Sequence, residues 1–135
     1  MNNKKLGTRF EQVMCKALAE KGFWVHFISP DARGAQPFDI IAVRDDLAVA
    51  IDCKTCEDHI FRISRLEDNQ VNAFDLWRAR GNSLAYIAVF HKEKIYMINY
   101  TDLKRDKNIQ LDKIEAWANG VSLFEKKRTR VMEMR

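Results

Sequence analysis

Apolar residues recur first at helical and then at strand-like spacing, and this pattern predicts the first half of the fold. The helical stripe consists of Leu6, Phe10, Val13, Met14, Ala17 and Leu18. Gly22 follows this stripe and is typical of a helix end. Aromatic and β-branched runs then predict strands over 24–28, 38–43 and 47–54. Because only Arg44-Asp45-Asp46 separates the last two runs, they should form an antiparallel hairpin.

The second half of the chain continues in the same way. Ser64-Arg65-Leu66-Glu67 matches a capping box, which predicts a helix from Ser64 that ends at Gly81. Strands are predicted over 84–90 and 95–98, joined by a turn over 91–94, and a modest helix over 111–118 is closed by Gly120. The resulting order, α-β-β-β-α-β-β-α, predicts an α/β domain with a mixed β-sheet flanked by helices.

Composition limits the class of protein. The chain has 135 residues, 47% hydrophobic and 31% charged, which suits one folded domain and excludes a disordered, collagenous or disulfide-scaffold class. No apolar run approaches the roughly 20 residues of a membrane span. The N-terminal residues lack the apolar core of a signal peptide. We therefore expect a cytoplasmic protein that does not bind membranes.

Charge is uneven along the chain. The net charge is +4, and residues 125–135 hold five bases and two acids, so most of the excess lies there. We expect a single domain over 1–124 followed by a basic C-terminal tail over 125–135. Such a tail suits phosphate contacts, although a solvated and frayed terminus explains it equally well.

The cysteines and histidines give a weaker signal. Three cysteines argue against a disulfide framework, and Cys53 and Cys56 form a lone CxxC. A zinc or iron–sulfur site would need further ligands, so two reduced and partly buried thiols are the simpler interpretation. The three histidines are scattered and form no zinc set.

The predicted hairpin brings two acidic residues together. If its turn is centred between Asp45 and Asp46, counting outward places Asp39 opposite Asp52 on one face, with Cβ atoms about 5 Å apart. Like charges so placed are destabilising unless a divalent cation lies between them. Lys54, two residues beyond Asp52, projects from the same face. A three-residue loop would shift this register.

Two more polar residues point to the same place. Glu11 lies at the border of the apolar face of the first helix, from which a carboxylate can reach a cleft. Gln70 occupies an apolar position in the stripe of the second helix, so its amide needs a hydrogen-bonding partner. Each residue also has a simpler explanation. The aspartates could be edge carboxylates paired with Lys54, Glu11 a solvated acid, and Gln70 an exposed amide on a helix rotated differently.

Together these residues resemble the PD-(D/E)xK nuclease superfamily. The match is Pro37-Phe38-Asp39, twelve intervening residues, and Asp52-Cys53-Lys54, with Asp in place of the more common Glu. The context is similar to the Holliday junction resolvases: Gly7-Thr8-Arg9-Phe10-Glu11, Arg33-Gly34, and Phe61-Arg62-Ile63-Ser64 leading to Gln70. The helix that bears Gln70, followed by Gly81-Asn82 and the strand over 84–90, is similar to bacterial RecU-type resolvases, and the compact length is nearer the archaeal ones. Only 27 residues separate Glu11 from Asp39, so the long stalk of the RecU type does not fit.

The resemblance implies a restriction-endonuclease-like core and hydrolysis of DNA phosphodiester bonds with Mg²⁺ or Mn²⁺. It makes Asp39 and Asp52 metal ligands, with Glu11 as a further acidic ligand or a ligand to a metal-bound water, and the main-chain carbonyl of Cys53 as another contact to the metal. Lys54 would orient the attacking water and stabilise the transition state, and Gln70 would position water or Lys54. Hard oxygen ligands and a nearby ammonium group suit this chemistry.

The resemblance also implies that the substrate is branched DNA in the form of a four-way junction. It further implies a homodimer, because two symmetric cuts need two active sites. We expect a role in recombination or repair and a bacterial or phage source. The candidate DNA contacts are Lys4, Lys5, Arg33, Arg62, Arg65, Lys126, Lys127, Arg128 and Arg130. Two alternatives stay open. One is a restriction or repair nuclease on the same core, and the other is a DNA-binding module that has lost cleavage.

Overall fold

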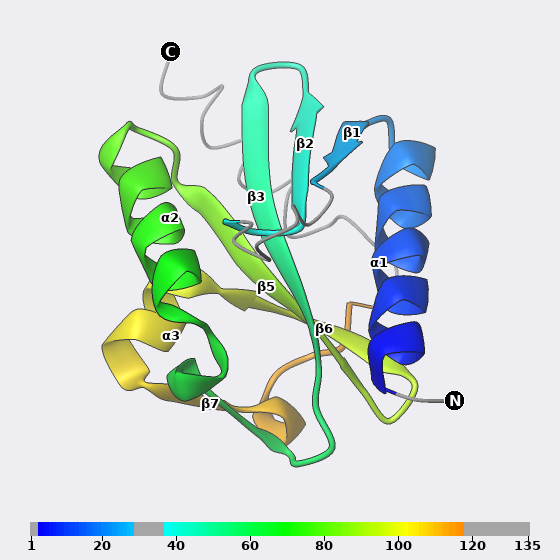
Figure 1. The fold of residues 1–135 in the computed structure, drawn as a ribbon, viewed down its shortest axis with the longest axis vertical. Helices are drawn as coiled ribbons and strands as arrows, with labels where there is room; N and C mark the ends of the chain where they lie inside the picture. Colours follow the sequence, from blue (N-terminus) through cyan, green and yellow to red (C-terminus); the bar gives the residue numbers. More distant parts are fainter. Residues whose placement is uncertain (1–2, 29–36, 118–135) are drawn as a thin grey trace.

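A five-stranded mixed sheet forms the centre of the molecule (Figure 1). The computed structural model describes residues 3–28 and 37–117, with side chains from Arg9 onward. In chain order the elements are α1 (Asn3–Glu20), β1 (Trp24–Phe27), β2 (Ile40–Arg44), β3 (Leu47–Thr55), β4 (Ile60–Arg62), the 3₁₀ turn η1 (Ile63–Arg65), α2 (Asp68–Ala79), β5 (Leu84–His91), β6 (Lys94–Asn99), α3 (Tyr100–Asp106), β7 (Asn108–Gln110) and the 3₁₀ turn η2 (Leu111–Lys113). The order across the sheet is β1-β2-β3-β5-β6. The expected α/β class with a mixed sheet is confirmed.

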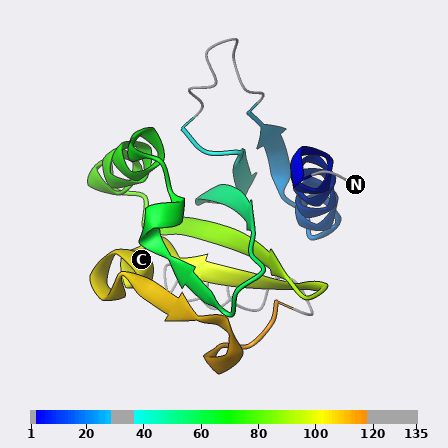
Figure 2. The same ribbon diagram turned by 60° about the horizontal axis from the view of Figure 1, so that its bottom comes forward.

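Only the β3–β5 pair is parallel in this sheet, and α2 lies in the connection between these two strands. Parallel neighbours need such a crossover, which returns the chain to the same edge. Helix α1 covers one face of the sheet, while α2 and α3 cover the other (Figures 1 and 2). Each face therefore has its own apolar core.

The predicted hairpin of β2 and β3 is confirmed together with its register. Ile40 pairs with Ile51 and Arg44 with Leu47, so only Asp45 and Asp46 form the loop. The first helix also ends as predicted. Gly22 has a φ of +90°, a left-handed conformation that glycine adopts without strain, and its N–H donates to the carbonyl of Ala19 at 3.0 Å.

The predicted start of the second helix is wrong. Residues 63–65 form the 3₁₀ turn η1, and Leu66 is extended with φ −88° and ψ 137°. Helix α2 begins only at Asp68, and its capping box consists of Glu67 and Gln70. The extended conformation lets Leu66 bury its side chain in the core beneath α2 and α3. Its burial therefore prevents the helix from starting at Ser64.

The predicted helix over 111–118 is also wrong for the part that the structure describes. Residues 111–113 form only η2, and residues 114–117 are irregular. Within residues 37–117 the last helix is α3, which lies earlier, and the Asn99 side chain before it accepts a hydrogen bond from the N–H of Thr101. The short strands β4 and β7 pair beyond the main sheet, and the sequence pattern did not indicate either. Within residues 3–28 and 37–117, no helix is both long and apolar enough to span a membrane.

Candidate active site

The β2–β3 hairpin places the two aspartates side by side. The N–H of Asp39 donates to the carbonyl of Ile51 at 3.1 Å, which extends the ladder one residue beyond β2. The carboxylate of Asp39 then accepts a hydrogen bond from the N–H of Cys53 at 2.7 Å. Backbone and side chain of Asp39 are thus both tied to β3 on either side of Asp52. The predicted juxtaposition of Asp39 and Asp52 is present in the structure.

Both aspartates are buried, with exposed fractions of 4% for Asp39 and 0% for Asp52. Burial raises the pKa of Asp52 well above its usual range, and the neighbouring charge of Asp39 raises it further, while Lys54 lowers it. The negative charge of Asp39 thus opposes the ionisation of Asp52. The arrangement is therefore electrostatically unfavourable by itself, and added positive charge would stabilise it.

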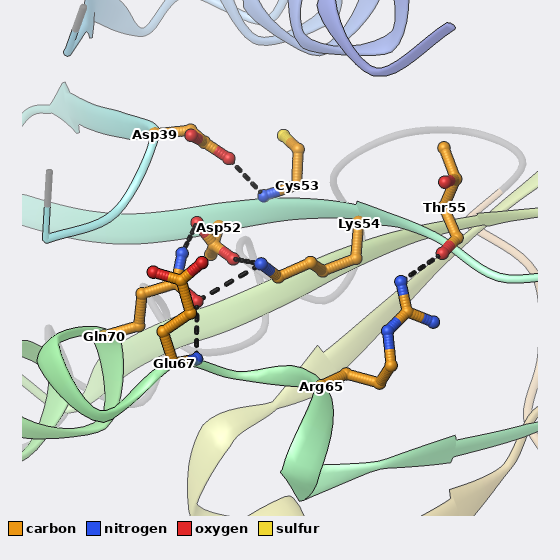
Figure 3. A network of polar contacts seen from close by, with 8 residues as sticks. All are labelled: Asp39, Asp52, Cys53, Lys54, Thr55, Arg65, Glu67 and Gln70. Atoms are coloured by element: carbon orange, nitrogen blue, oxygen red, sulfur yellow. Dashed lines mark hydrogen bonds and ion pairs between the residues drawn. The ribbon is translucent and has the colours of Figure 1, made fainter. Parts of the chain in front are cut away.

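Lys54 and Gln70, which were both predicted to lie near the aspartates, contact Asp52 (Figure 3). Its Oδ1 accepts a hydrogen bond from Gln70 Nε2 at 3.0 Å, and its Oδ2 lies 3.3 Å from Lys54 Nζ. Lys54 Nζ also donates to Gln70 Oε1 at 3.2 Å. The three side chains therefore form a closed triangle, in which Gln70 is 6% exposed. The interpretation of Gln70 as an exposed amide is wrong.

Gln70 also caps the helix that carries it. Its Oε1 accepts a hydrogen bond from the N–H of Glu67 at 3.0 Å, while the Glu67 side chain accepts one from the N–H of Gln70. This reciprocal pair is a capping box, which satisfies N–H groups that have no partner within the helix. The N-terminus of α2 is thereby fixed directly beside Asp52.

Glu11 reaches the same site from α1. It lines a pocket of about 240 Å³ together with Asp39, Asp52, Cys53, Lys54, Glu67 and Gln70. Burial, and then the charge of Asp39, raise the pKa of Glu11 to about 7. Glu11 is thus not an ordinary solvated acid. Sequence reasoning missed Glu67, although its spacing of three residues before Gln70 is a capping-box signal.

The pocket fits a hard divalent cation. Asp52 Oδ2 is buried and lies 3.3 Å from Lys54 Nζ, so one ammonium group faces the carboxyl groups of Glu11, Asp39 and Asp52 in this pocket. Among the described residues no three His, Cys, Asp or Glu side chains are already gathered as a ready-made cage. Mg²⁺ does not need one, because it usually keeps several waters and binds through one or two carboxylates and substrate phosphates. Asp39 and Asp52 match that requirement.

The cysteines show the simpler of the two expected behaviours. All three are free thiols, and the Cys56 thiol donates to the carbonyl of Asp58 at 3.0 Å. Burial, followed by the charge of Asp39, raises the pKa of the Cys53 thiol well above its usual range. The expected free and partly buried thiols are thus present in Cys53, which is half-buried, and Cys56, which is buried.

Comparison with known proteins decides the family. The family model described as "Archaeal holliday junction resolvase (hjc)" matches residues 2–131, nearly the whole chain. The chain belongs to the archaeal Holliday junction resolvase family. The resemblance noted in the sequence is thereby confirmed, and the chain is a junction-resolving nuclease of recombination.

A solved structure agrees with this assignment at the level of the fold. The Hjc resolvase of the archaeal hyperthermophile Archaeoglobus fulgidus shares the fold with a TM-score of 0.59 and 23% identity. The match covers 77% of this chain and 86% of that chain. A search of curated proteins gives no match. The expected bacterial or phage source finds no support, because the matching family is archaeal.

Among the basic residues predicted to contact DNA, the structure describes the side chains of Arg62 and Arg65. Arg62 follows Ile60 and Phe61 in β4, and Arg65 ends η1; both are exposed. Arg33 and the tail residues Lys126, Lys127, Arg128 and Arg130 lie outside the described residues, as do the side chains of Lys4 and Lys5. Their contacts with DNA stay predictions.

Proposed function

We propose that this resolvase is a divalent-metal-dependent endonuclease that cuts four-way DNA junctions as a homodimer, with Mg²⁺ or Mn²⁺ held by Asp39 and Asp52. One observation carries the proposal. Two buried aspartates share one face of a hairpin, and Lys54 is the single base among the described residues that line their pocket. A cation at this place would remove the mutual repulsion of the two carboxylates.

Glu11 completes the acidic side of the site in this proposal. It lines the same pocket as the aspartates, and burial, followed by the charge of Asp39, raises its pKa to about 7. It would bind the cation directly or through a bound water. The main-chain carbonyl of Cys53, between Asp52 and Lys54, is the remaining candidate ligand.

The bound cation would act as a Lewis acid, which neutralises phosphate charge and lowers the pKa of a bound water. The protein's own groups do the positioning. Lys54 Nζ lies 3.3 Å from Asp52 and would orient the attacking water and donate to the phosphate oxygens as negative charge accumulates. Gln70 holds Lys54 through Oε1 and Asp52 through Nε2, so it fixes the ammonium and the carboxylate relative to each other.

Cleavage of a synthetic four-way junction, beside matched linear duplex and single strand, tests this proposal. Each substrate is incubated with Mg²⁺, Mn²⁺ or EDTA and with wild type, Asp52→Asn, or Asp112→Asn as a control at an exposed carboxylate outside the pocket. We expect paired symmetric nicks in the junction alone, lost in EDTA and in Asp52→Asn but kept in Asp112→Asn. Cutting of all substrates would remove junction selectivity. Tight junction binding without cleavage would favour a DNA-binding module.

The homodimer is tested separately. Sedimentation of the full chain, free and with junction DNA, should give a species of two chains, and two chains on each junction. A monomer that makes both nicks would contradict this part of the proposal.

A further inference from the structure

A second pocket begins where the active-site strand ends. It has a volume of about 680 Å³ and lies between the ends of β3 and β5 and the segment that contains β4 and η1. Thr55, which directly follows Lys54 in β3, lines it. Because a strand rises about 3.3 Å per residue, the backbone of Thr55 at this pocket lies one such step beyond that of Lys54, although the two side chains point to opposite faces. Its volume falls within the range of about 300–1,000 Å³ that is typical of small-ligand sites.

Arg65 is held in a fixed position at this pocket. Its Nη2 donates to the carbonyl of Thr55 at 2.8 Å, and its guanidinium carbon lies 5.6 Å from the centre of the Phe61 ring (Figure 3 shows the contact with Thr55). Arg65 has no ion pair with an acidic side chain in the part of the chain that the structure describes. The other guanidinium N–H groups keep their capacity to donate, because the residue is exposed. A planar cation fixed in this way is suited to phosphate oxygens.

Arg62 lines the same pocket but is electrically compensated. Its Nη1 donates to Asp58 Oδ2 at 3.1 Å, and this hydrogen bond is the main reason why the pKa of Asp58 lies below its usual value. Phosphate binding at Arg62 would compete with Asp58. Arg65 meets no such competition, so the two arginines of one pocket should differ in their effect.

We propose that this pocket is a second DNA subsite, which binds the backbone phosphate of a nucleotide next to the scissile bond, and that Arg65 contacts this phosphate. The proposal rests on the proposed function and adds the path of the DNA strand beyond Lys54. Phosphates follow one another along each strand at about 3.4 Å of helix axis, so a strand with one phosphate at Asp52 brings neighbouring phosphates near Thr55. The competing explanation is structural, because Arg65 also ties η1 to β3.

Salt dependence of binding separates these explanations. Binding of a fluorescent four-way junction is measured in EDTA from about 50 to 200 mM salt for the full chain, Arg65→Gln, Arg65→Lys and the control Arg80→Gln, an exposed arginine that lines neither pocket. Glutamine at position 65 removes the charge but keeps a donor for the Thr55 carbonyl. Melting temperatures and cleavage with Mg²⁺ are recorded for the same proteins.

We expect Arg65→Gln to bind about tenfold more weakly at ~0.1 M salt, with a slope of log K against log salt shallower by about 0.9. Arg65→Lys should keep the slope, and Arg80→Gln should change both quantities much less. An unchanged slope for Arg65→Gln, or an equal loss for Arg80→Gln, would overturn the subsite. A lower melting temperature with an unchanged slope would identify a structural tie instead. If wild type bound but cut no junction, the proposed function would fail, whereas a changed slope would still support the subsite.

Discussion

Gln70 takes part both in the capping box of α2 and in the triangle with Asp52 and Lys54. Replacing it with Glu should affect the free energy of unfolding with opposite sign through these two sets of contacts. As the third residue of a helix, Glu is favoured in a capping box, and a negative charge near a helix N-terminus stabilises by about 0.3–1 kcal/mol. The helix alone therefore predicts that Gln70→Glu is neutral or slightly stabilising.

The site predicts the opposite sign. The substitution removes the Nε2 donor that lies 3.0 Å from Asp52 Oδ1, and Asp52 is fully buried. A buried acceptor left without its donor costs about 1–3 kcal/mol, or more when it is charged. The new carboxylate repels Asp52, but Lys54 attracts it from a similar distance. Because these two Coulomb contributions oppose each other, we expect a net destabilisation of about 2 kcal/mol in metal-free protein.

Urea unfolding followed by tryptophan fluorescence measures this difference in EDTA and in Mg²⁺. We expect Gln70→Glu to unfold at lower urea than wild type in EDTA and to recover much of the loss in Mg²⁺, because the added carboxylate offers a further hard oxygen to the cation. Asn69→Glu, one position earlier in α2, controls for the added charge at the helix N-terminus. If Gln70→Glu were at least as stable as wild type in EDTA, the hydrogen bond from Gln70 to Asp52 would not contribute to the free energy of unfolding, and the reasoning would be refuted.

Three further outcomes follow from the site and its surroundings. Because the pKa of Glu11 is raised to about 7, the folded protein binds this proton more tightly than the unfolded chain, and the free energy of unfolding in EDTA should fall as pH rises from about 4.5 to 7. In urea unfolding, Glu11→Gln should flatten this dependence and be more stable than wild type at pH 8. Lys54→Met should lower the single-turnover cleavage rate at least about 100-fold while calorimetric Mg²⁺ affinity stays the same or rises, and a wild-type rate would exclude the proposed role of Lys54. Tyr100→Phe should lower the free energy of unfolding by about 1–2 kcal/mol without changing cleavage, because the buried hydroxyl donates to Asp75 at 2.8 Å and lies outside the pocket.

The hairpin could be predicted because little freedom remained in it. With only two residues in the loop, one register is compatible with the apolar positions of both strands, and that register places Asp39 beside Asp52. Gln70 could be predicted because an amide within an apolar stripe needs a partner. These local constraints also identified Lys54, since side chains two residues apart share a face of a strand.

The errors arose where tertiary packing decided the local structure. The segment around Glu67 contains two candidate capping boxes, and the burial of Leu66 selects the second. Helix α3 buries only Tyr100 and Leu103, so its seven residues are too few to show a helical period. Glu67 was missed as a lining residue because a charged side chain before a helix has the pattern of a solvated cap.

The hydrogen bond from the Cys53 N–H to the Asp39 carboxylate makes Asp39 part of the pairing between β2 and β3. A slip of the hairpin by one residue would turn Asp52 and Lys54 to the opposite face and break this bond in the same step. A chain with a slipped hairpin would therefore lack the paired aspartates and the lysine together, so the complete acidic site exists only in molecules with the native register.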